Sequence, residues 1–328
     1  MPNRLDRRRG ERLTTKDEQK RHSPKAGFWD RVSTDVIVGL MILGVLAIAA
    51  TIFATRALTK STPPQPPFAQ VYAIHAVNGA SKSFLAADGK GLLQTANGGT
   101  KWRAIAFKDQ PVTALVRDFA SPQTYLAVAQ GALHRSDDSG ASWRTLSSNL
   151  PAGEIAALAA DPASLQQLYA FVKGNGLYRS ADGGGTWSQT QAIADADLTT
   201  LAVKAGDPQT VYAFHTRRAL VRSTDGGKTF TPIGEAAFAR AVAGILTVAD
   251  APSRVYAVAA GTVRPIYKSE DDGITWKPSS EGITTVEVAA LARDPASADL
   301  YVTDTSGVLY VSRNQGALWQ PLNTAAAP

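Results

Sequence analysis

An eight-residue pattern recurs six times along this chain of 328 residues, at nearly constant intervals. The clearest copy, at residues 180–187, reads SADGGGTW. The shared pattern is Ser or Thr, any residue, Asp or Asn, any residue, Gly, any residue, often Thr or Ser, and an aromatic residue. The copies start at residues 95, 136, 180, 223, 269 and 312, so the intervals are 41, 44, 43, 46 and 43 residues. A fixed period of this length is the signature of a repeat architecture.

Each copy predicts a tight turn between two β-strands. The Asp182 side chain can accept hydrogen bonds from nearby backbone N–H groups and so close the loop. Gly184 allows a positive φ without steric cost, and Trp187 begins the next strand and points into the core. We therefore expect a structural role for the third and eighth residues of every copy. These residues are Asn97, Asp138, Asp182, Asp225, Asp271 and Asn314, followed by Trp102, Trp143, Trp187, Phe230, Trp276 and Trp319.

The pattern resembles the Asp-box, also called the BNR repeat, whose consensus is Ser-x-Asp-x-Gly-x-Thr-Trp. Four copies match this consensus closely. In the first and last copies, Asn97 and Asn314 replace Asp, and Lys101 and Leu318 replace Thr. The resemblance covers about residues 68–324 and implies a β-propeller fold, whereas it says much less about activity.

The residues between the copies predict four short antiparallel strands per repeat, here called strands A to D. In the third repeat they are expected at 155–160, 167–172, 177–180 and 187–191, with the box between the last two. Six such repeats predict an all-β, six-bladed β-propeller of four-stranded antiparallel blades, with strand A of each blade lining a central channel. A seventh blade would require residues 68–76 to pair with the end of the chain in an unexpected way.

Positive charge is concentrated before the repeats. Residues 1–67 contain 12 Lys and Arg against 6 Asp and Glu, whereas residues 68–328 contain 22 of each. Residues 1–34 are polar and basic, so we expect a disordered cytoplasmic tail, with contact to nucleic acid or anionic lipid as the alternative. The repeat region is neutral overall, which argues against nucleic-acid binding by the propeller.

Residues 35–55 are expected to form a transmembrane helix. Positions 36–54 are an uncharged apolar run of 19 residues, which can cross a hydrocarbon core of about 30 Å. The basic tail predicts a single-pass, N-inside signal anchor, with a cleaved signal peptide as the alternative. Four prolines make residues 56–67 an extended linker. The propeller is then expected on the extracytoplasmic side of the plasma membrane, with residues 325–328 as a short tail.

The antiparallel strand order assigns every loop to one of two faces. The A–B loops and the boxes share one face, and the B–C and D–A loops share the other. Five cations on the B–C loops predict a docking patch for an anion or an acidic peptide, with ordinary solvated turn charge as the alternative. These B–C cations are Lys90, Lys173, Arg217, Arg218 and Arg264. The acidic residues expected on the same face are Asp88, Asp109, Glu154, Asp195, Asp197, Glu235, Glu281, Glu287 and Asp304.

Residues that carry catalytic or metal chemistry are sparse. The chain has no Cys, which excludes disulfides and thiolate metal sites. His75, His134 and His215 fall in different repeats at unrelated positions, and one Asp per box supplies fewer oxygen ligands than calcium needs. We therefore predict no metal site, no cofactor and no catalytic residue.

Several groups of Asp-box propellers suggest hypotheses about the function of this chain. Sialidases carry an Arg-Ile-Pro motif before the first box, whereas residues 68–94 contain no Arg. Sortilin-type receptors carry a cysteine-rich module that this chain lacks. Residues 176–187, GLYRSADGGGTW, are similar to repeats of the photosystem II assembly and stability factor-like group. This resemblance implies a scaffold that binds a protein partner without catalysis. The alternative is a glycoside hydrolase, sialidase-like or otherwise carbohydrate-active, with carbohydrate as its ligand.

Overall fold

The computed structural model describes most of the repeat region. The described residues are 68, 70–77, 82–191, 198–234, 242–248, 253–283, 287–294 and 296–322. The chain divides into two compact units, Met1–Pro63 and Pro64–Pro328, and only the second contains described residues. The expected basic tail at 1–34, transmembrane helix at 35–55, linker at 56–67 and tail at 325–328 lie outside them. Within the described ranges, no helix is long and apolar enough to cross a membrane.

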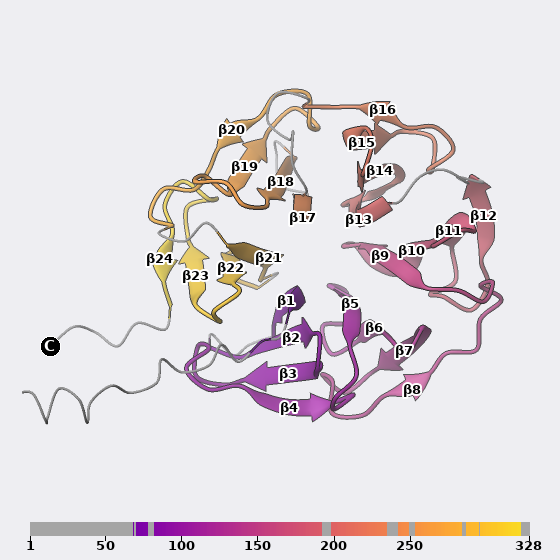
Figure 1. The fold of residues 1–328 in the computed structure, drawn as a ribbon, viewed down its shortest axis with the longest axis horizontal. Coiled ribbons are helices and arrows are strands. Elements are labelled where there is room, and N and C mark those ends of the chain that lie inside the picture. Colours follow the sequence, from indigo (N-terminus) through magenta and orange to yellow (C-terminus); the bar gives the residue numbers. More distant parts are fainter. Residues whose placement is uncertain are drawn as a thin grey trace, which may run out of the picture. The chain divides into compact units, whose positions relative to one another are not determined.

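Six four-stranded antiparallel sheets are arranged around a central axis as the blades of a propeller (Figure 1). The innermost strands are β1 (Val71–Ala76), β5 (Val112–Arg117), β9 (Ile155–Asp161), β13 (Leu198–Lys204), β17 (Val242–Val248) and β21 (Val288–Arg293). The second strands are β2 (Phe84–Asp88), β6 (Tyr125–Ala129), β10 (Ser164–Val172), β14 (Asp207–His215), β18 (Arg254–Ala259) and β22 (Leu300–Asp304).

The two outer strands of each blade flank its Asp-box. The third strands are β3 (Gly91–Thr95), β7 (Ala132–Ser136), β11 (Gly176–Ser180), β15 (Ala219–Ser223), β19 (Ile266–Ser269) and β23 (Leu309–Ser312). The outermost strands are β4 (Arg103–Ala106), β8 (Arg144–Thr145), β12 (Ser188–Gln191), β16 (Thr231–Pro232), β20 (Lys277–Pro278) and β24 (Gln320–Pro321). The described residues therefore form six blades, which confirms the six-bladed fold expected from the six boxes.

Side-chain packing, without a shared strand, closes the ring between the last blade and the first. Each of these blades is built from four consecutive strands, β1 to β4 and β21 to β24. Phe84 of β2 packs edge-on against Tyr301 of β22, with ring centroids 4.8 Å apart. Val71, Ile74 and Phe84 share one buried cluster with residues of the last blade. Burial of each such apolar side chain stabilises the fold by about 1.5–3 kcal/mol. Apolar packing therefore holds the first and last blades together.

The second strand of each blade has neighbouring blades on both sides, which explains its composition. Every residue of β2, β6, β18 and β22 is buried. Such strands read as continuous apolar runs without alternation, for example YLAVA in β6. Buried tyrosines on these strands also bond to the next blade: the Tyr169 hydroxyl donates to the Pro208 carbonyl at 2.7 Å and the Tyr256 hydroxyl donates to the Gln315 carbonyl at 3.0 Å. The blades are thus joined by polar contacts as well as by apolar packing.

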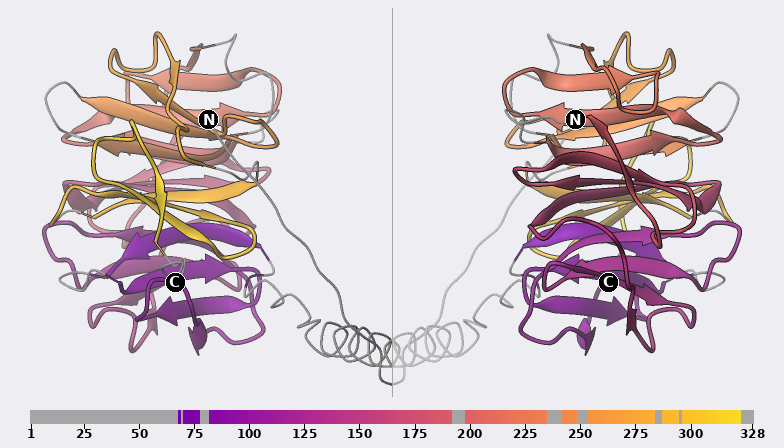
Figure 2. Two further views of the ribbon diagram at one scale, coloured as in Figure 1. Left: turned by 90° about the vertical axis from the view of Figure 1, so that its left-hand side faces the viewer. Right: turned by 90° about the vertical axis from the view of Figure 1, so that its right-hand side faces the viewer.

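The two faces of the ring, which is seen edge-on in Figure 2, carry different loops. On one face, here called the box face, the Asp-boxes bond to the A–B connections, as in Gly98 N to Lys82 O at 2.8 Å and Gly226 N to Gln209 O at 2.9 Å. On the other, here called the B–C face, the D–A connections bond to the B–C turns, as in Lys173 N to Glu154 O at 2.9 Å. The loop assignment made from strand order is therefore correct.

Candidate functional site

The Asp-boxes are closed by a set of hydrogen bonds that repeats from blade to blade. In the third blade, the Ser180 hydroxyl donates to Asp182 Oδ1 at 2.8 Å and accepts from the Gly184 amide at 2.9 Å. The Thr186 hydroxyl donates to Asp182 Oδ2 at 2.6 Å, and the Thr186 amide donates to Oδ1 at 2.9 Å. The Trp187 indole N–H donates to the Gly184 carbonyl at 2.9 Å. The polar side chains of this box are therefore hydrogen-bonded within the turn itself.

The buried leading hydroxyl is the feature of the box that sequence reasoning missed. Ser136, Ser180, Ser223, Ser269 and Ser312 are each 1% exposed, and each accepts a hydrogen bond from the Gly amide four residues later. The fourth position, like the fifth, has a positive φ in every copy, including 58° at Asp272. The turn therefore depends on two consecutive left-handed residues and on one buried hydroxyl.

The two degraded boxes retain this geometry with a smaller set of bonds. Asn97 Oδ1 accepts from the Thr95 hydroxyl at 2.8 Å and from the Lys101 amide at 2.9 Å. Asn314 Oδ1 accepts from the Ser312 hydroxyl at 2.9 Å and from the Leu318 amide at 2.8 Å. In these copies Lys or Leu replaces Thr, so an Asp in place of the Asn would find no Thr hydroxyl to donate to its second carboxylate oxygen. An amide therefore substitutes for the carboxylate without leaving an acceptor unused.

Hydrogen bonding holds the box aspartates in their charged form. The Thr186 hydroxyl and amide, together with the Ser180 hydroxyl, lower the pKa of Asp182 to about 2. The equivalent groups around Asp138, led by the Ser142 hydroxyl, lower its pKa to about 2 as well. Both carboxylates accept three or four hydrogen bonds from their own turns. They therefore act as structural acceptors that close the turns.

The B–C cations are exposed, and four of the five form no ion pair within the described ranges. Lys90, Arg217, Arg218 and Arg264 have exposed side chains on the turns of the first, fourth and fifth blades. Lys173 is the exception, because its Nζ lies 3.6 Å from Glu154 Oε2. Sequence reasoning missed a sixth cation, Lys108, which is exposed on the first D–A connection. It lies near Lys90, since the Asp109 amide donates to the Lys90 carbonyl at 2.9 Å.

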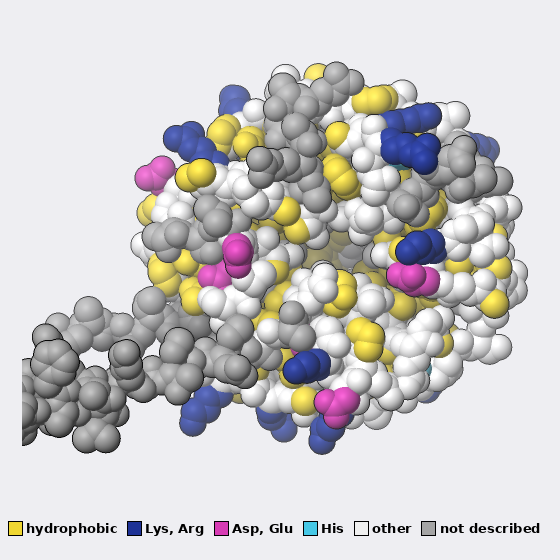
Figure 3. All heavy atoms as spheres, in the orientation of Figure 1, with side chains coloured by type: hydrophobic (Ala, Val, Ile, Leu, Met, Phe, Trp, Pro, Cys, Tyr) yellow, Lys and Arg dark blue, Asp and Glu magenta, His cyan; other side chains and the backbone are white. Residues whose placement is uncertain are grey.

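Of the described acidic residues expected on the B–C face, Asp109, Glu154, Glu281 and Glu287 are exposed and offset part of this charge, whereas two others are buried. Asp88 and Asp304 are 1% and 5% exposed, so they are not surface charges. They accept backbone N–H groups of their own turns instead, including Lys90 N at 3.0 Å and Ser306 N at 2.9 Å. Three further acids expected on this face, Asp195, Asp197 and Glu235, lie outside the described residues. In Figure 3, dark blue and magenta side chains lie around the ring, in places side by side, and yellow side chains surround the central opening.

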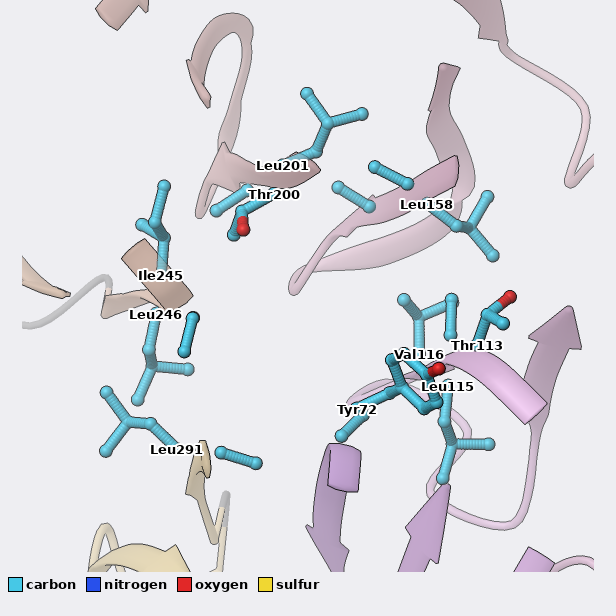
Figure 4. Close-up of a pocket in the computed structure, with 18 of the residues that line it drawn as sticks. Tyr72, Thr113, Leu115, Val116, Leu158, Thr200, Leu201, Ile245, Leu246 and Leu291 are labelled. Carbon is cyan, nitrogen blue, oxygen red and sulfur yellow. The ribbon is translucent and has the colours of Figure 1, made fainter. Parts of the chain in front are cut away.

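The central channel contains a cavity of about 600 Å³, lined mainly by aliphatic side chains of the six innermost strands (Figure 4). Leu158, Leu201, Ile245 and Leu291 are among its lining residues, together with many alanines. Among the described lining residues, Glu154 is the one carboxylate and Arg117 is the one cation. Most glycoside hydrolases use two carboxyl groups about 5–9.5 Å apart, and the described wall of the channel carries one carboxylate, Glu154.

The three histidines of the repeat region lie in three different blades, as their unrelated positions in the sequence predict. His75 on β1 lines the cavity, and its Nε2 lies 2.9 Å from the Leu115 carbonyl. Burial lowers the pKa of His75 to about 4, so the ring is neutral at pH 7. His134 on β7 and His215 on β14 are each 8% exposed. Nowhere in the described ranges do three or more His, Cys, Asp or Glu gather as a metal ion requires.

Comparison with known proteins places the repeats in a wider group. A family model described as Sortilin-Vps10 (sortilin, neurotensin receptor 3) matches residues 131–243. A xyloglucanase from a Paenibacillus species is 28% identical over 232 residues, which is 65% of this chain. The chain spans 20% of the length of that relative.

Solved structures with the same architecture are more distant in sequence. The GH74 xyloglucanase from Xanthomonas campestris has a TM-score of 0.55 at 16% identity, over 79% of this chain and 46% of its own. The GH74 enzyme from Niastella koreensis has a TM-score of 0.54 at 18% identity, with the same coverage of both chains. A structure of YCF48 bound to a D1 peptide has a TM-score of 0.49 at 18% identity, over 78% of this chain and 82% of its own. With its six boxes, its six blades and the sortilin-type match, this chain is an Asp-box, or BNR-repeat, β-propeller.

Proposed function

We propose that this propeller is a non-catalytic docking domain that binds an acidic segment of a partner protein on its B–C face. The observation that carries the proposal is a set of exposed cations that form no ion pair within the described part of the chain: Lys90, Arg217, Arg218 and Arg264, with Lys108 near Lys90. Surface cations without local partners raise the association rate and the specificity for an acidic partner.

The turn that carries the paired arginines is well ordered by its own hydrogen bonds. The Arg218 amide donates to the His215 carbonyl at 3.1 Å, and the Arg217 amide donates to the His215 ring Nδ1 at 3.1 Å. A turn fixed before binding loses less conformational entropy when a partner docks. Val263, beside Arg264, is 84% exposed and adds an apolar contact at the tip of the next blade. The fourth and fifth blades therefore offer the strongest part of the surface.

The cellular location that we propose for the propeller is supported by the sequence alone. We propose that residues 35–55 anchor the chain in the plasma membrane as a single pass, and that the propeller lies on the extracytoplasmic side. The uncharged run of 19 residues at 36–54 and the basic segment before it support this orientation. Protease added to intact cells should digest the propeller, whereas digestion only after lysis would contradict the orientation.

Crosslinking of the membrane-bound protein, followed by identification of the captured partner, tests the docking proposal. The informative variant reverses three B–C face charges: Arg217→Glu, Arg218→Glu and Arg264→Glu. Its matched control reverses three exposed lysines of the box face, namely Lys82→Glu, Lys101→Glu and Lys228→Glu. We expect capture to fall at least tenfold in the first variant and to persist in the second. Equal capture by both variants would refute docking on the B–C face.

Hydrolysis of xyloglucan is a second candidate, favoured by the 28% identity to a xyloglucanase. The likeness covers 65% of this chain and 20% of that enzyme, so the substrate cannot be transferred with the fold. Release of reducing sugar from xyloglucan by the purified protein would support this candidate. Absence of hydrolysis together with a captured acidic partner would support docking instead.

A further inference from the structure

The second residue of every innermost strand is the extra residue of a β-bulge. In each blade, the first residue of strand A pairs with the last residue of strand B, and the third residue of strand A pairs with the residue before it. The second residue is therefore left without a pairing partner in the sheet. Bulges re-aim side chains and are frequent next to active sites. The six bulge residues are Tyr72, Thr113, Ala156, Thr199, Ala243 and Ala289.

These six bulge residues form a ring at one mouth of the central channel. All six line the cavity of about 600 Å³ (Figure 4), and all six are partly or fully exposed. The ring lies at the B–C face, because every innermost strand begins there. Tyr72 and Thr113 stand on the adjacent first and second blades, whereas the fifth and sixth blades carry Ala243 and Ala289. The bulge recurs in every blade, but its side chains give the mouth a polar side and an apolar side.

The polar side of the ring offers two hydroxyl groups. Neither Tyr72 nor Thr113 makes a side-chain hydrogen bond to another residue of the described ranges. Burial, together with the charges of Asp88 and Glu154, raises the pKa of the Tyr72 hydroxyl, so this group keeps its proton at pH 7. Each hydroxyl can donate one hydrogen bond and accept others. The pair therefore suits a ligand head that both donates and accepts.

The cavity offers no free charge to a charged head. Its one described cation, Arg117, is 3% exposed and donates from Nη1 and Nε to two backbone carbonyls at 2.6 and 3.2 Å. Its one described carboxylate, Glu154, already has Lys173 Nζ at 3.6 Å. Burial lowers the pKa of His75 to about 4, so that ring is neutral at pH 7. A charged head would lose hydration without gaining a partner, so the cavity favours a neutral ligand.

We propose that the central channel binds a neutral aliphatic alcohol, with its hydroxyl group at Tyr72 and Thr113 and its tail along the channel wall. Pockets of about 300–1,000 Å³ that are mostly apolar and carry a few placed polar groups are typical of small-molecule sites. The aliphatic wall favours longer tails by about fourfold in affinity per buried methylene group. This site is separate from the docking surface proposed above, since none of the B–C cations lines the cavity.

Photolabelling of the full-length protein with an octanol that carries a diazirine group tests this proposal. Light converts the diazirine into a carbene that inserts into nearby bonds, and mass spectrometry of the digested protein locates the adducts. We expect adducts on the innermost strands that excess octanol suppresses. Hexanol, which lacks two methylene groups, should compete about tenfold more weakly, and octanoate should compete at least tenfold more weakly than octanol. Adducts found only outside the channel, or equal competition by octanol and octanoate, would overturn the proposal.

Substitutions in the ring test the hydroxyl groups and the cavity separately. Tyr72→Phe combined with Thr113→Val removes both hydroxyl groups at nearly constant shape. The octanol concentration that halves labelling should then rise about tenfold, since each hydrogen bond contributes about two- to tenfold in affinity. Thr216→Val, on an exposed B–C turn, is the matched control and should leave this concentration unchanged.

A larger side chain on the apolar side of the ring provides an independent test. Ala243 is exposed and lines the cavity, so the indole of Ala243→Trp should fill the mouth and abolish the labelling that octanol suppresses. Such labelling in the Ala243→Trp variant would place the ligand elsewhere and overturn the proposal. An unchanged octanol concentration in the Tyr72→Phe, Thr113→Val variant would overturn the placement of the hydroxyl head.

Discussion

Removal of one buried hydroxyl, in the variant Ser180→Ala, should destabilise the whole propeller. The Ser180 hydroxyl is the hydrogen-bond acceptor for the Gly184 amide at 2.9 Å, and Ser180 is 1% exposed. Without it, a buried N–H group loses its partner and no water replaces it, which costs about 1–3 kcal/mol. The longer contact from the Asp182 amide, at 3.3 Å, is lost as well. We therefore expect the free energy of unfolding to fall by about 2–3 kcal/mol.

Urea and thermal unfolding of the purified protein measure this change directly. For a domain of this size, a loss of about 2–3 kcal/mol lowers the melting temperature by roughly 4–12 °C. Ser188→Ala is the matched control, because Ser188 is exposed and its hydroxyl contacts the Arg179 carbonyl only at 3.5 Å. We expect this control to stay within about 0.5 kcal/mol of the wild type. A Ser180→Ala variant as stable as its control would refute the assignment of the hydroxyl as the centre of the turn.

Three further perturbations test other parts of the structure. Phe84→Ala should lower the free energy of unfolding by about 3–5 kcal/mol, since it removes the ring contact to Tyr301 that closes the propeller; a loss below 1 kcal/mol in urea unfolding would contradict this. Because hydrogen bonding lowers the pKa of the box aspartates to about 2, the stability they contribute is full above about pH 4. This contribution to stability should decrease as the pH falls toward 2. In thermal unfolding, the melting temperature should therefore fall less with pH when Asn replaces these aspartates. Introducing Asn97→Asp together with Lys101→Thr should raise the melting temperature by restoring the missing hydroxyl bond, whereas Asn97→Asp alone should not.

The fold was predictable because each blade carries its own local signal. A box whose Asp, Gly and aromatic residues stand at fixed positions specifies a turn between two strands, and its recurrence sets the number of blades. Strand limits were less predictable: β10 begins at Ser164, three residues earlier than expected, because a register shift lengthens its pairing with β9. The start of a strand beyond such an irregularity depends on its neighbour, which the local sequence does not encode.

The candidate sites were only partly predictable, because their chemistry depends on neighbours far along the chain. The B–C turn of the fourth blade is the polar segment Thr216-Arg217-Arg218, so the exposure of the two arginines follows from the local sequence. The segment VTALVR, in contrast, reads as an ordinary strand ending in a cation. The burial of Arg117 and its bond to Ala76 arise only when the first two blades pack together, since 41 residues separate the two partners.

Equivalent positions at the ends of the innermost strands carry different side chains in the six blades. At the position of Arg117, the other innermost strands carry Ala76, Ala160, Val203, Thr247 and Arg293. The Thr247 hydroxyl bonds to the Val203 carbonyl, so Thr satisfies the brace between blades that Arg117 makes to Ala76. In the fifth blade a hydroxyl therefore makes the inter-blade bond that a guanidinium makes in the second. The repeat explains what recurs in each blade, and ligand binding is best sought among the residues that depart from it.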